Sequence, residues 1–384
     1  MTSPADMPVL FDTRTAGSNG RRVGIITLNT PSTLNALSLS MAKLLDAQLG
    51  QWAGDPDIAM VVLQGAGEKA FCAGGDLHSL YQGMLDWRKS GSNRIQDNSY
   101  AAEFFKVEYR VDHRIHTYDK PILCWGHGIV MGGGIGLMAG ASHRIVSERS
   151  RLAFPEISVG LFPDVGGSWL LNRVPDRAGV FLALTGAPLS AGDAIHAGLA
   201  DSHLPEASRD EVLAALLARD WSDQALENHG LLDTLLAGFA QPAPAGPLQQ
   251  HAGLIAEICA QERLEDVVAA IQAIDAGDDT WLARAQQTLA AGSPGSARLG
   301  FDLQQRAAGM SLADTFRMEY IVALHCAAHG DFAEGIRALL IDKDRKPNWQ
   351  PPTLEEADAA FAARFLEAPA WSRDRHPLAE LGSH

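Results

Sequence analysis

The chain is poor in cysteine: Cys72, Cys124, Cys259 and Cys326 are the four among its 384 residues. They form no CxxC pair and no cluster with histidine, which excludes the commonest zinc-binding patterns. Widely separated cysteines are typical of packed thiols in a reducing compartment. We therefore expect four buried thiols and no metal site.

Positive charge is also scarce. The sequence has 31 Lys and Arg against 46 Asp and Glu, a net charge of −15, and no run of basic residues. This balance excludes an extended nucleic-acid surface, which needs clustered cations. No apolar run reaches the length of a membrane span, and residues 1–8 lack the basic and apolar blocks of a signal peptide. The sequence therefore predicts a cytoplasmic protein without a nucleic-acid or membrane partner.

Strand and helix patterns alternate in the first part of the chain. Short β-rich runs at residues 22–28, 58–64 and 121–125 predict strands. Between the first two, apolar residues recur at helical spacing after Ser38, and residues 54–56 (Gly-Asp-Pro) break the pattern. The repeated order of strand, helix and strand predicts an α/β protein with a large core.

The second part of the chain has a different character. Residues 88–98 are polar and predict a mobile loop, and residues 103–110 have a helical pattern. A linker-like segment rich in proline spans residues 241–247, and the chain beyond it is rich in Ala, Leu and charge. We therefore expect a catalytic core over residues 1–236 and a mainly helical region over 237–384.

A glycine turn and two carboxylates indicate chemistry at a bound carbonyl. Residues 131–137 read Met-Gly-Gly-Gly-Ile-Gly-Leu, a turn that opens a helix. Backbone N–H groups at such a helix start favour developing negative charge. Glu156 and Asp164 follow, each embedded in apolar or Gly/Pro sequence rather than in a charged surface pattern. Such carboxylates could move protons or direct water.

The glycine turn has a second interpretation. Residues 134–139 formally match the dinucleotide fingerprint, with Glu156 about twenty residues further on. The fingerprint should directly follow the first strand of a βαβ unit, whereas this match lies in the middle of the chain behind further glycines. This position disfavours dinucleotide binding.

Four other residues have the side chains of nucleophiles or bases but lack a supporting motif. No GxSxG elbow surrounds Ser168, and no Cys–His pattern is readable around the others. We therefore predict structural roles for Cys72, His127, His143 and Ser168.

The motifs taken together resemble a known family. Asn35-Ala36-Leu37, Phe-Cys-Ala-Gly-Gly-Asp at 71–76 and the triple glycine at 132–134 resemble the crotonase, or enoyl-CoA hydratase/isomerase, superfamily. The closer similarity is to its 3-hydroxyisobutyryl-CoA hydrolase branch. That similarity is carried by residues 155–156, 160–167, 184–186, 330–338, 340–344 and 347–349.

The resemblance implies a fold, a partner and a site. The fold would be an α/β superhelix of repeated ββα units with a C-terminal helical region, and the partner an acyl-CoA. The carbonyl oxygen would meet the backbone N–H groups of Gly75 and Gly133, with Glu156 and Asp164 as catalytic carboxylates. The implied substrate-binding residues are Asn35, Ala36, Leu37, Ala73, Asp76 and Glu108. No metal or other cofactor is required, because coenzyme A is part of the substrate, and relatives commonly form homo-oligomers.

Glu108 is the least specific of these assignments. Glu103, Lys106, Glu108 and Arg110 follow one another at a spacing that an ordinary charged helix surface would also show. Both interpretations remain open.

Position 136 separates the possible reactions. The hydratases of the superfamily carry a second catalytic glutamate where this chain has Gly136, which cannot transfer a proton. A thioester hydrolase needs an oxyanion hole and one activated water, so hydrolysis of a short 3-hydroxyacyl-CoA is preferred. The resemblance implies 3-hydroxyisobutyryl-CoA and a role in valine degradation. An enoyl-CoA hydratase or isomerase, or a non-catalytic acyl-CoA-binding protein, remain the alternatives.

Overall fold

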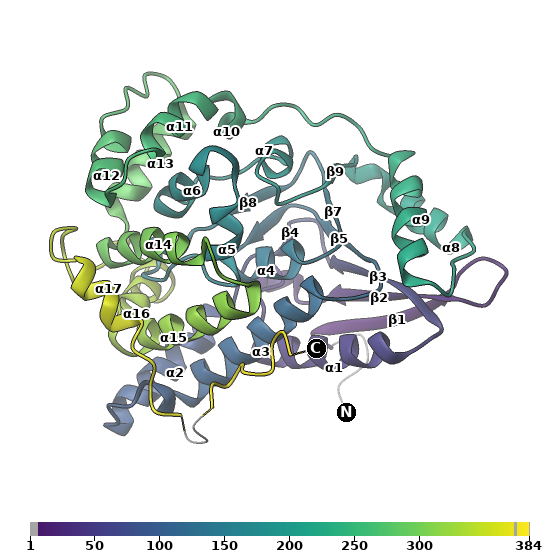
Figure 1. The fold of residues 1–384 in the computed structure, drawn as a ribbon, viewed down its shortest axis with the longest axis horizontal. Helices are drawn as coiled ribbons and strands as arrows, with labels where there is room; N and C mark the ends of the chain where they lie inside the picture. The colour runs from purple at the N-terminus through teal and green to yellow at the C-terminus, as the bar shows by residue number, and fades with distance from the viewer. Residues whose placement is uncertain (1–6, 372–374, 384) are drawn as a thin grey trace. The chain divides into compact units, whose positions relative to one another are not determined.

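The computed structural model describes residues 7–371 and 375–383 (Figure 1). The first six residues, on which the signal-peptide prediction rests in part, lie outside the described residues. In the part of the chain that is described, no helix has the length and apolar character needed to cross a bilayer.

The chain forms two compact units, each assembled from three separate stretches. Unit 1 comprises residues Met1–Gly75, Arg110–Leu152 and Leu189–Gln249, and unit 2 comprises Asp76–Tyr109, Ala153–Pro188 and Gln250–His384. The predicted functional division between residues 236 and 237 stays a prediction.

A six-stranded sheet forms the centre of unit 1. Its order is β1-β2-β3-β5-β7-β9, with β1 antiparallel to β2 and the other neighbours parallel. The strands are β1 Val9–Thr15, β2 Arg22–Leu28, β3 Ile58–Gly65, β5 Ile122–Gly126, β7 His143–Val146 and β9 Ser202–His203. The three strands predicted from β-rich runs are confirmed as β2, β3 and β5. A second sheet joins the short strands β4 Ala70–Cys72, β6 Ile129–Met131 and β8 Arg151–Ala153.

Two helices of unit 1 begin where the local sequence predicts. Helix α1, Leu39–Gly54, starts after Ser38, whose side chain accepts a hydrogen bond from Met41 N, and it ends before Asp55-Pro56. Helix α4, Gly133–Ala139, confirms that the glycine turn opens a helix. The remaining helices are α7 Ala191–His196, α8 Arg209–Ala218 and α9 Ala225–Ala237.

The core of unit 1 lies between the sheet and the helix pair α8 and α9 (Figure 1). Trp221, between these helices, is 1% exposed and packs with apolar side chains of β2, β3 and β5. Burial of a large apolar side chain contributes roughly 1.5–3 kcal/mol, so this cluster fastens α8 and α9 to the sheet.

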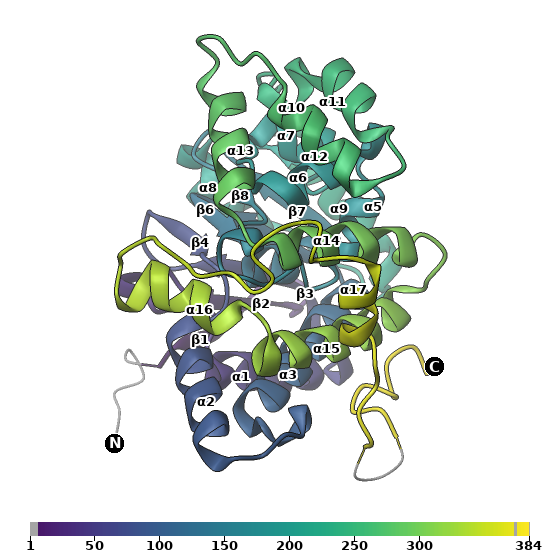
Figure 2. The ribbon, with the colours of Figure 1, turned by 90° about the vertical axis from the view of Figure 1, so that its left-hand side faces the viewer.

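Unit 2 is mostly helical, which confirms the prediction for the C-terminal part of the chain. Helix α15 packs beside α2 and α16 (Figure 2), while α14 packs on α5, α6 and α17. The helices are α2 Leu77–Ser90, α5 Gly167–Asn172, α6 Ala178–Thr185, α11 Ala252–Cys259, α12 Leu264–Gln272, α13 Thr280–Ala291, α14 Pro294–Ala307, α15 Leu312–His329, α16 Phe332–Ile336 and α17 Ala359–Phe365. Helices α3 Ser99–His116 and α10 Pro247–Gln250 include residues of both units.

Short helical turns complete the chain. They are η2 Pro31–Thr33, η3 Ile95–Asp97, η4 Glu156–Ser158, η5 Pro175–Arg177, η6 Glu206–Ser208 and the π-helical η7 Arg337–Ile341.

The prediction of one loop over residues 88–98 is wrong in its bounds. Helix α2 continues to Ser90, because Arg88 and Lys89 in its last turn suit the negative end of the helix dipole. The rest of the segment is tied down, since Trp87 Nε1 donates to Arg94 O at 3.1 Å.

Candidate active site

Two glycine turns of unit 1 carry the predicted carbonyl donors. Gly75 follows Gly74, whose φ is 105°, and Gly133 follows Gly132, whose φ is 48°. Both preceding glycines adopt the left-handed region, which other residues enter only with strain. Gly133 is the first residue of α4, a position whose N–H has no acceptor within its own helix. The turn thus presents a backbone donor at the start of α4.

The two turns lie next to each other. A Cβ atom on Gly74 would lie 3.3 Å from Met131 O and 3.9 Å from Gly133 N. On Gly134 a Cβ atom would lie 2.2 Å from Cys72 O, so only glycine permits the strand end to approach α4 this closely. The structure therefore places Gly75 and Gly133 on neighbouring segments, and their role as an oxyanion hole stays a prediction.

The segment Asn35-Ala36-Leu37, predicted to bind substrate, fastens the first of these turns. Leu37 N donates to Gly74 O at 2.8 Å, and Ala73 N donates to Leu34 O at 3.0 Å. Leu37 also pairs with Gly75 in an isolated parallel bridge. The N–H of Gly75 takes no part in the two backbone bonds just described.

The side chain of Asn35 is committed to the backbone. Its Oδ1 accepts from Thr30 N at 2.9 Å, and its Nδ2 donates to the carbonyl oxygens of Ala66 and Ala70, each at 2.9 Å. Asn35 has a φ of 54°, a conformation that Asn tolerates better than most residues. The side chain therefore shapes the loop, while the predicted substrate contact remains untested.

Asp76 has a role that the sequence analysis missed. It is the N-cap of α2, where its Oδ1 accepts from Ser79 N at 3.2 Å and its Oδ2 from Ser79 Oγ at 2.6 Å. The signal was available, because Asp before a helical run is a typical N-cap.

Buried carboxyl groups gather in unit 2. Glu156 and Asp164 are each 4% exposed, Glu108 on α3 is 2% exposed and Glu319 on α15 is fully buried. Asp164 Oδ2 accepts a hydrogen bond from the hydroxyl of Tyr109 at 2.7 Å. Glu156 Oε2 is buried without a hydrogen-bond partner among the described residues. The predicted catalytic pair thus occupies a desolvated environment, and the surface interpretation of Glu108 is wrong.

Burial is the main cause of the shifted pKa values of these groups. It raises the pKa of Glu156 well above its usual value, with the charge of Asp164 adding to the effect. Burial also raises the pKa of Asp164 to about 6, against the opposing hydrogen bond from Tyr109. Burial and the charge of Asp164 raise the pKa of Glu319 to about 8, and they also raise the pKa of Tyr109. Tyr109 is therefore a stable hydroxyl donor, and Asp164 titrates close to neutral pH.

Tyr109 and Glu319 were not identified from the sequence. Tyr109 lies in the helical pattern at residues 103–110, where an aromatic residue is expected to pack in the core. Glu319 precedes the apolar run Tyr320–Leu324, and a carboxylate beside a buried face is the one available signal. Their partners are distant in sequence, so no local pattern reveals them.

The C-terminal motif at residues 330–338 holds the carboxylate loop. A Cβ atom on Gly160 would lie 2.4 Å from the carbonyl carbon of Asp331, and one on Gly335 would lie 2.4 Å from the carbonyl carbon of Val159. Backbone therefore packs on backbone at two points of the loop that connects Glu156 with Asp164. This contact explains why glycines occupy both segments.

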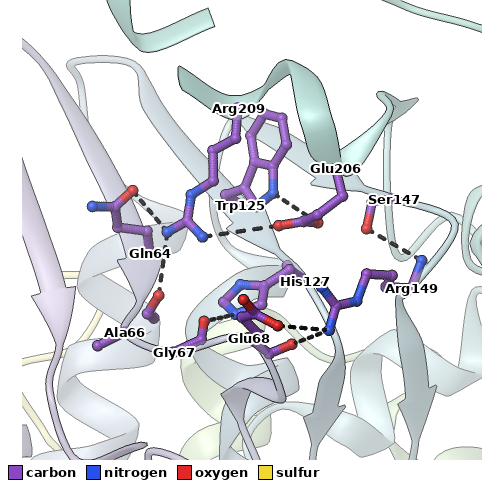
Figure 3. Close-up of polar contacts among 12 residues, drawn as sticks. Gln64, Ala66, Gly67, Glu68, Trp125, His127, Ser147, Arg149, Glu206 and Arg209 are labelled. Carbon is purple, nitrogen blue, oxygen red and sulfur yellow. Dashed lines mark hydrogen bonds and ion pairs between the residues drawn. The ribbon is translucent and has the colours of Figure 1, made fainter. Parts of the chain in front are cut away.

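A pocket of about 460 Å³ lies elsewhere in unit 1, beside the loop after β3. Of the predicted site residues, Asn35 lines it, together with Pro31, Leu34, Ala66, Gly67, Glu68, Lys69, Ala70 and Arg149. Arg149 Nη2 donates to Glu68 O at 2.9 Å, and His127 Nε2 contacts Gly67 O at 2.9 Å (Figure 3). Because a carbonyl only accepts, Nε2 carries the proton in this contact. His127 is thus bonded to the loop after β3, and its expected structural role stays a prediction.

The polar network continues beside this pocket. Arg209 Nη2 donates to Gln64 Oε1 at 2.9 Å and to Gly65 O at 3.2 Å, and Trp125 Nε1 donates to Glu206 Oε2 at 3.3 Å (Figure 3). These bonds tie the ends of β3 and β5 to η6 and α8, which keeps the pocket wall in place.

The remaining predictions concern cysteines and metals. All four cysteines are free and buried, as expected. Burial raises the pKa of Cys124, Cys259 and Cys326, which keeps these thiols protonated at neutral pH. Among residues 7–371 and 375–383, no group of three His, Cys, Asp or Glu side chains is arranged to hold a metal ion.

Comparison with known proteins gives consistent matches over most of the chain. The model of the enoyl-CoA hydratase/isomerase family matches residues 23–366. A curated protein of Danio rerio named 3-hydroxyisobutyryl-CoA hydrolase, mitochondrial, is 36% identical over 96% of this chain and 91% of its own length. The crystal structure of an enoyl-CoA hydratase from Rhodobacter sphaeroides is 36% identical, with a TM-score of 0.80, and covers 94% of this chain and 97% of its own. That of a carnitinyl-CoA dehydratase from Mycobacterium thermoresistibile is 34% identical, with a TM-score of 0.82 and the same two coverages.

Proposed function

Since this chain belongs to the enoyl-CoA hydratase/isomerase family, we propose that it hydrolyses a short 3-hydroxyacyl-CoA thioester, with 3-hydroxyisobutyryl-CoA as the expected substrate. The α/β crotonase-like fold with a C-terminal helical region is confirmed by the similar solved structures. The observation that carries the proposed reaction is the full-length similarity to a curated protein named as that hydrolase.

The backbone donors would act on the thioester carbonyl. When water attacks the carbonyl carbon, negative charge develops on the carbonyl oxygen, and the N–H groups of Gly75 and Gly133 would stabilise it. Loss of one such donor costs roughly 3–4 kcal/mol of transition-state stabilisation in comparable sites. The left-handed Gly74 and Gly132 support this role, because they orient the peptide that follows each of them.

The buried carboxyl groups would handle the proton and the water. Asp164 is suited to accept a proton from the attacking water, because a general base works best with a pKa near the operating pH. Glu156 would orient the water or the substrate hydroxyl through its unpartnered Oε2. Collapse of the tetrahedral intermediate breaks the C–S bond, and the CoA thiolate leaves and is protonated. Attack by a carboxylate to form an anhydride, which water then cleaves, would use the same groups.

Alkene hydration is the second candidate, because the similar solved structures carry the names hydratase and dehydratase. That reaction needs acid–base groups for both carbons of the double bond. Gly136 lies buried within α4, at the position of the second glutamate of the hydratases, and it offers no proton. This residue favours hydrolysis over hydration.

The decisive experiment measures thiol release from 3-hydroxyisobutyryl-CoA and hydration of crotonyl-CoA by the wild type and by Asp164→Asn. We expect thiol release by the wild type, a fall in kcat of about 10²-fold or more in the variant, and negligible hydration. The exposed Asp223→Asn is the matched control and should retain full activity.

Two results would contradict the proposal. Hydration without thiol release would assign the chain to the hydratases. Acyl-CoA binding without turnover of either substrate would support a binding protein.

Several further features belong to the same proposal. The reaction as written uses only protein side chains, backbone donors and water, so we propose no cofactor beyond the coenzyme A of the substrate. A role in valine degradation, a cytoplasmic location and a homo-oligomeric state remain proposals. The name of the Danio rerio relative places that protein in mitochondria.

A further inference from the structure

Glu319 carries a buried carboxyl group that the proposed mechanism does not use. It lies on α15, is fully buried, and faces the turn that follows Asp164. Burial of a carboxylate is costly unless hydrogen bonds compensate for the lost water. The contacts of Glu319 therefore show which segment of the chain its burial stabilises.

Both oxygens of Glu319 bind the backbone of this turn. Oε2 accepts from Gly166 N at 2.7 Å, and Oε1 accepts from Ser168 N at 2.9 Å. Gly166 is the N-cap of α5, and Ser168 is the second residue of that helix. These N–H groups lack acceptors within α5, so an acceptor from outside the helix is needed. Glu319 thus serves as the cap that Gly166, without a side chain, does not supply.

The turn needs such support because its backbone is strained. Val165 has a φ of 55°, which is unfavourable for a β-branched residue, and Gly166 has a φ of 81°. A residue held in this region costs roughly 1–3 kcal/mol and persists only where surrounding contacts enforce it. Gly167 N donates to Asp164 O at 2.6 Å, so the strained turn starts at the catalytic aspartate itself.

Helix α15 also contacts the hydrogen-bond donor of Asp164. Phe316, one turn before Glu319, packs on Tyr109 with ring centroids 5.5 Å apart, and Tyr109 donates its hydroxyl to Asp164. A Cβ atom on Gly166 would lie 3.3 Å from Phe316 Cζ, so the same aromatic ring touches the turn. One face of α15 therefore contacts both the turn and the hydrogen-bond donor of Asp164.

We propose that Glu319 is a positioning residue that holds the turn at residues 164–168 in its strained form and so keeps Asp164 aligned for proton transfer. This inference rests on the proposed thioester hydrolysis. The requirement for a carboxyl group follows from chemistry: each of its two oxygens can accept one N–H, the hydroxyl oxygen of the protonated form included, whereas a glutamine places an NH₂ donor against one of the two backbone donors.

The test compares Glu319→Gln, Glu319→Asp and the exposed control Glu257→Gln, each with a thermal unfolding midpoint to show that it is folded. We expect Glu319→Gln to lower kcat for thiol release by about 10- to 100-fold, since a displacement of about 1 Å can cost that much. KM should change by less than about threefold, because the mechanism assigns Glu319 no contact with substrate. Glu319→Asp keeps the carboxyl group with a shorter reach and should recover part of kcat.

A second readout does not depend on catalysis. Amide hydrogen exchange of the segment 164–172 should become faster in Glu319→Gln and stay unchanged in Glu257→Gln, because the N–H groups of Gly166 and Ser168 lose an acceptor. This measurement separates the two proposals. If the wild type releases no thiol, the proposed function fails, and faster exchange in this segment still supports Glu319 as the support of the turn.

Three outcomes would overturn the inference. They are a folded Glu319→Gln variant with wild-type kcat, a variant whose only defect is a raised KM, and unchanged exchange of the segment 164–172. A lower unfolding midpoint with unchanged kcat would likewise reduce Glu319 to a structural residue.

Discussion

Asp164 draws its properties from two neighbours, one aromatic and one acidic. Burial raises its pKa to about 6, and the hydrogen bond from Tyr109 opposes that rise. Glu319 accepts hydrogen bonds from the backbone N–H groups of Gly166 and Ser168, in the turn that follows Asp164. A single carboxylate thus combines a near-neutral pKa with a fixed position, the two properties that a general base requires.

The hydroxyl of Tyr109 can be removed without changing the ring. Tyr109→Phe takes away a hydrogen bond that favours the ionised form of Asp164, so the pKa of Asp164 should rise above about 6. The acidic limb of the profile of kcat/KM against pH should shift upward by about one unit, about 1.4 kcal/mol. Tyr118→Phe is the control, because the hydroxyl of Tyr118 bonds to Leu49 O at 2.8 Å in unit 1. A profile of Tyr109→Phe identical to that of the wild type would refute the assigned role of this bond.

At the scale of elements, short turns position the backbone N–H groups of Gly75 and Gly133, the proposed oxyanion donors. The turn at Gly74-Gly75 is fastened by Leu37 and lies against the start of α4. The carboxylate loop is fastened in the same manner by the motif at residues 330–338. In both places glycine permits backbone to pack on backbone.

Substitution of the left-handed glycine before the first donor tests this arrangement. Residue 74 has a φ of 105°, which is strained for alanine, and the added Cβ atom of Gly74→Ala would lie 3.3 Å from Met131 O. The peptide that follows residue 74 must therefore move. We expect kcat for thiol release to fall by about 10²-fold or more, as for loss of one oxyanion donor. Gly20→Ala is the control, because Gly20 has a φ of 80° and an added Cβ atom there would have no neighbour within 4 Å. This variant should lose about 1–3 kcal/mol of folding free energy and keep its kcat. Equal kcat values for the two variants would argue against the donor role of Gly75.

At the scale of the whole molecule, the buried carboxyl groups link stability to pH. The folded pKa values of Glu156, Asp164 and Glu319 lie above their unfolded values, so the folded state binds more protons between about pH 4 and pH 8. Stability is then complete below the unfolded pKa values and falls as pH rises through the folded ones. Buried histidines with lowered pKa values, such as His116, act in the opposite direction, but mainly below pH 6.5.

Measurements of unfolding between pH 6.5 and pH 8 report how the buried carboxyl groups contribute to the pH dependence of stability. We expect the free energy of unfolding of the wild type to fall across this window, by at most about 1.4 kcal/mol per pH unit for each retained proton. The triple variant Glu156→Gln, Asp164→Asn and Glu319→Gln should show a flatter dependence, because it cannot ionise at these positions. Equal slopes for both proteins would show that these groups do not ionise differently in the two states.

Much of the architecture follows from local sequence. Strands β2, β3 and β5, the Ser38 cap of α1 and the helix start at Gly133 were all predicted, because periodicity and turn chemistry act within a few residues. The family motifs also identified Glu156 and Asp164 before any contact was known. The bounds of α2 and the short strands β4, β6 and β8 were not predicted, since strands of three residues show no clear period.

The sequence by itself determined the elements, the glycine turns and the pair of candidate carboxylates. The tertiary structure alone decided how those carboxylates behave. Tyr109 reaches Asp164 across 55 residues, and Glu319 reaches Gly166 across 153. Desolvation and such long-range hydrogen bonds depend on which segments are buried together, and no local pattern in the chain encodes that information.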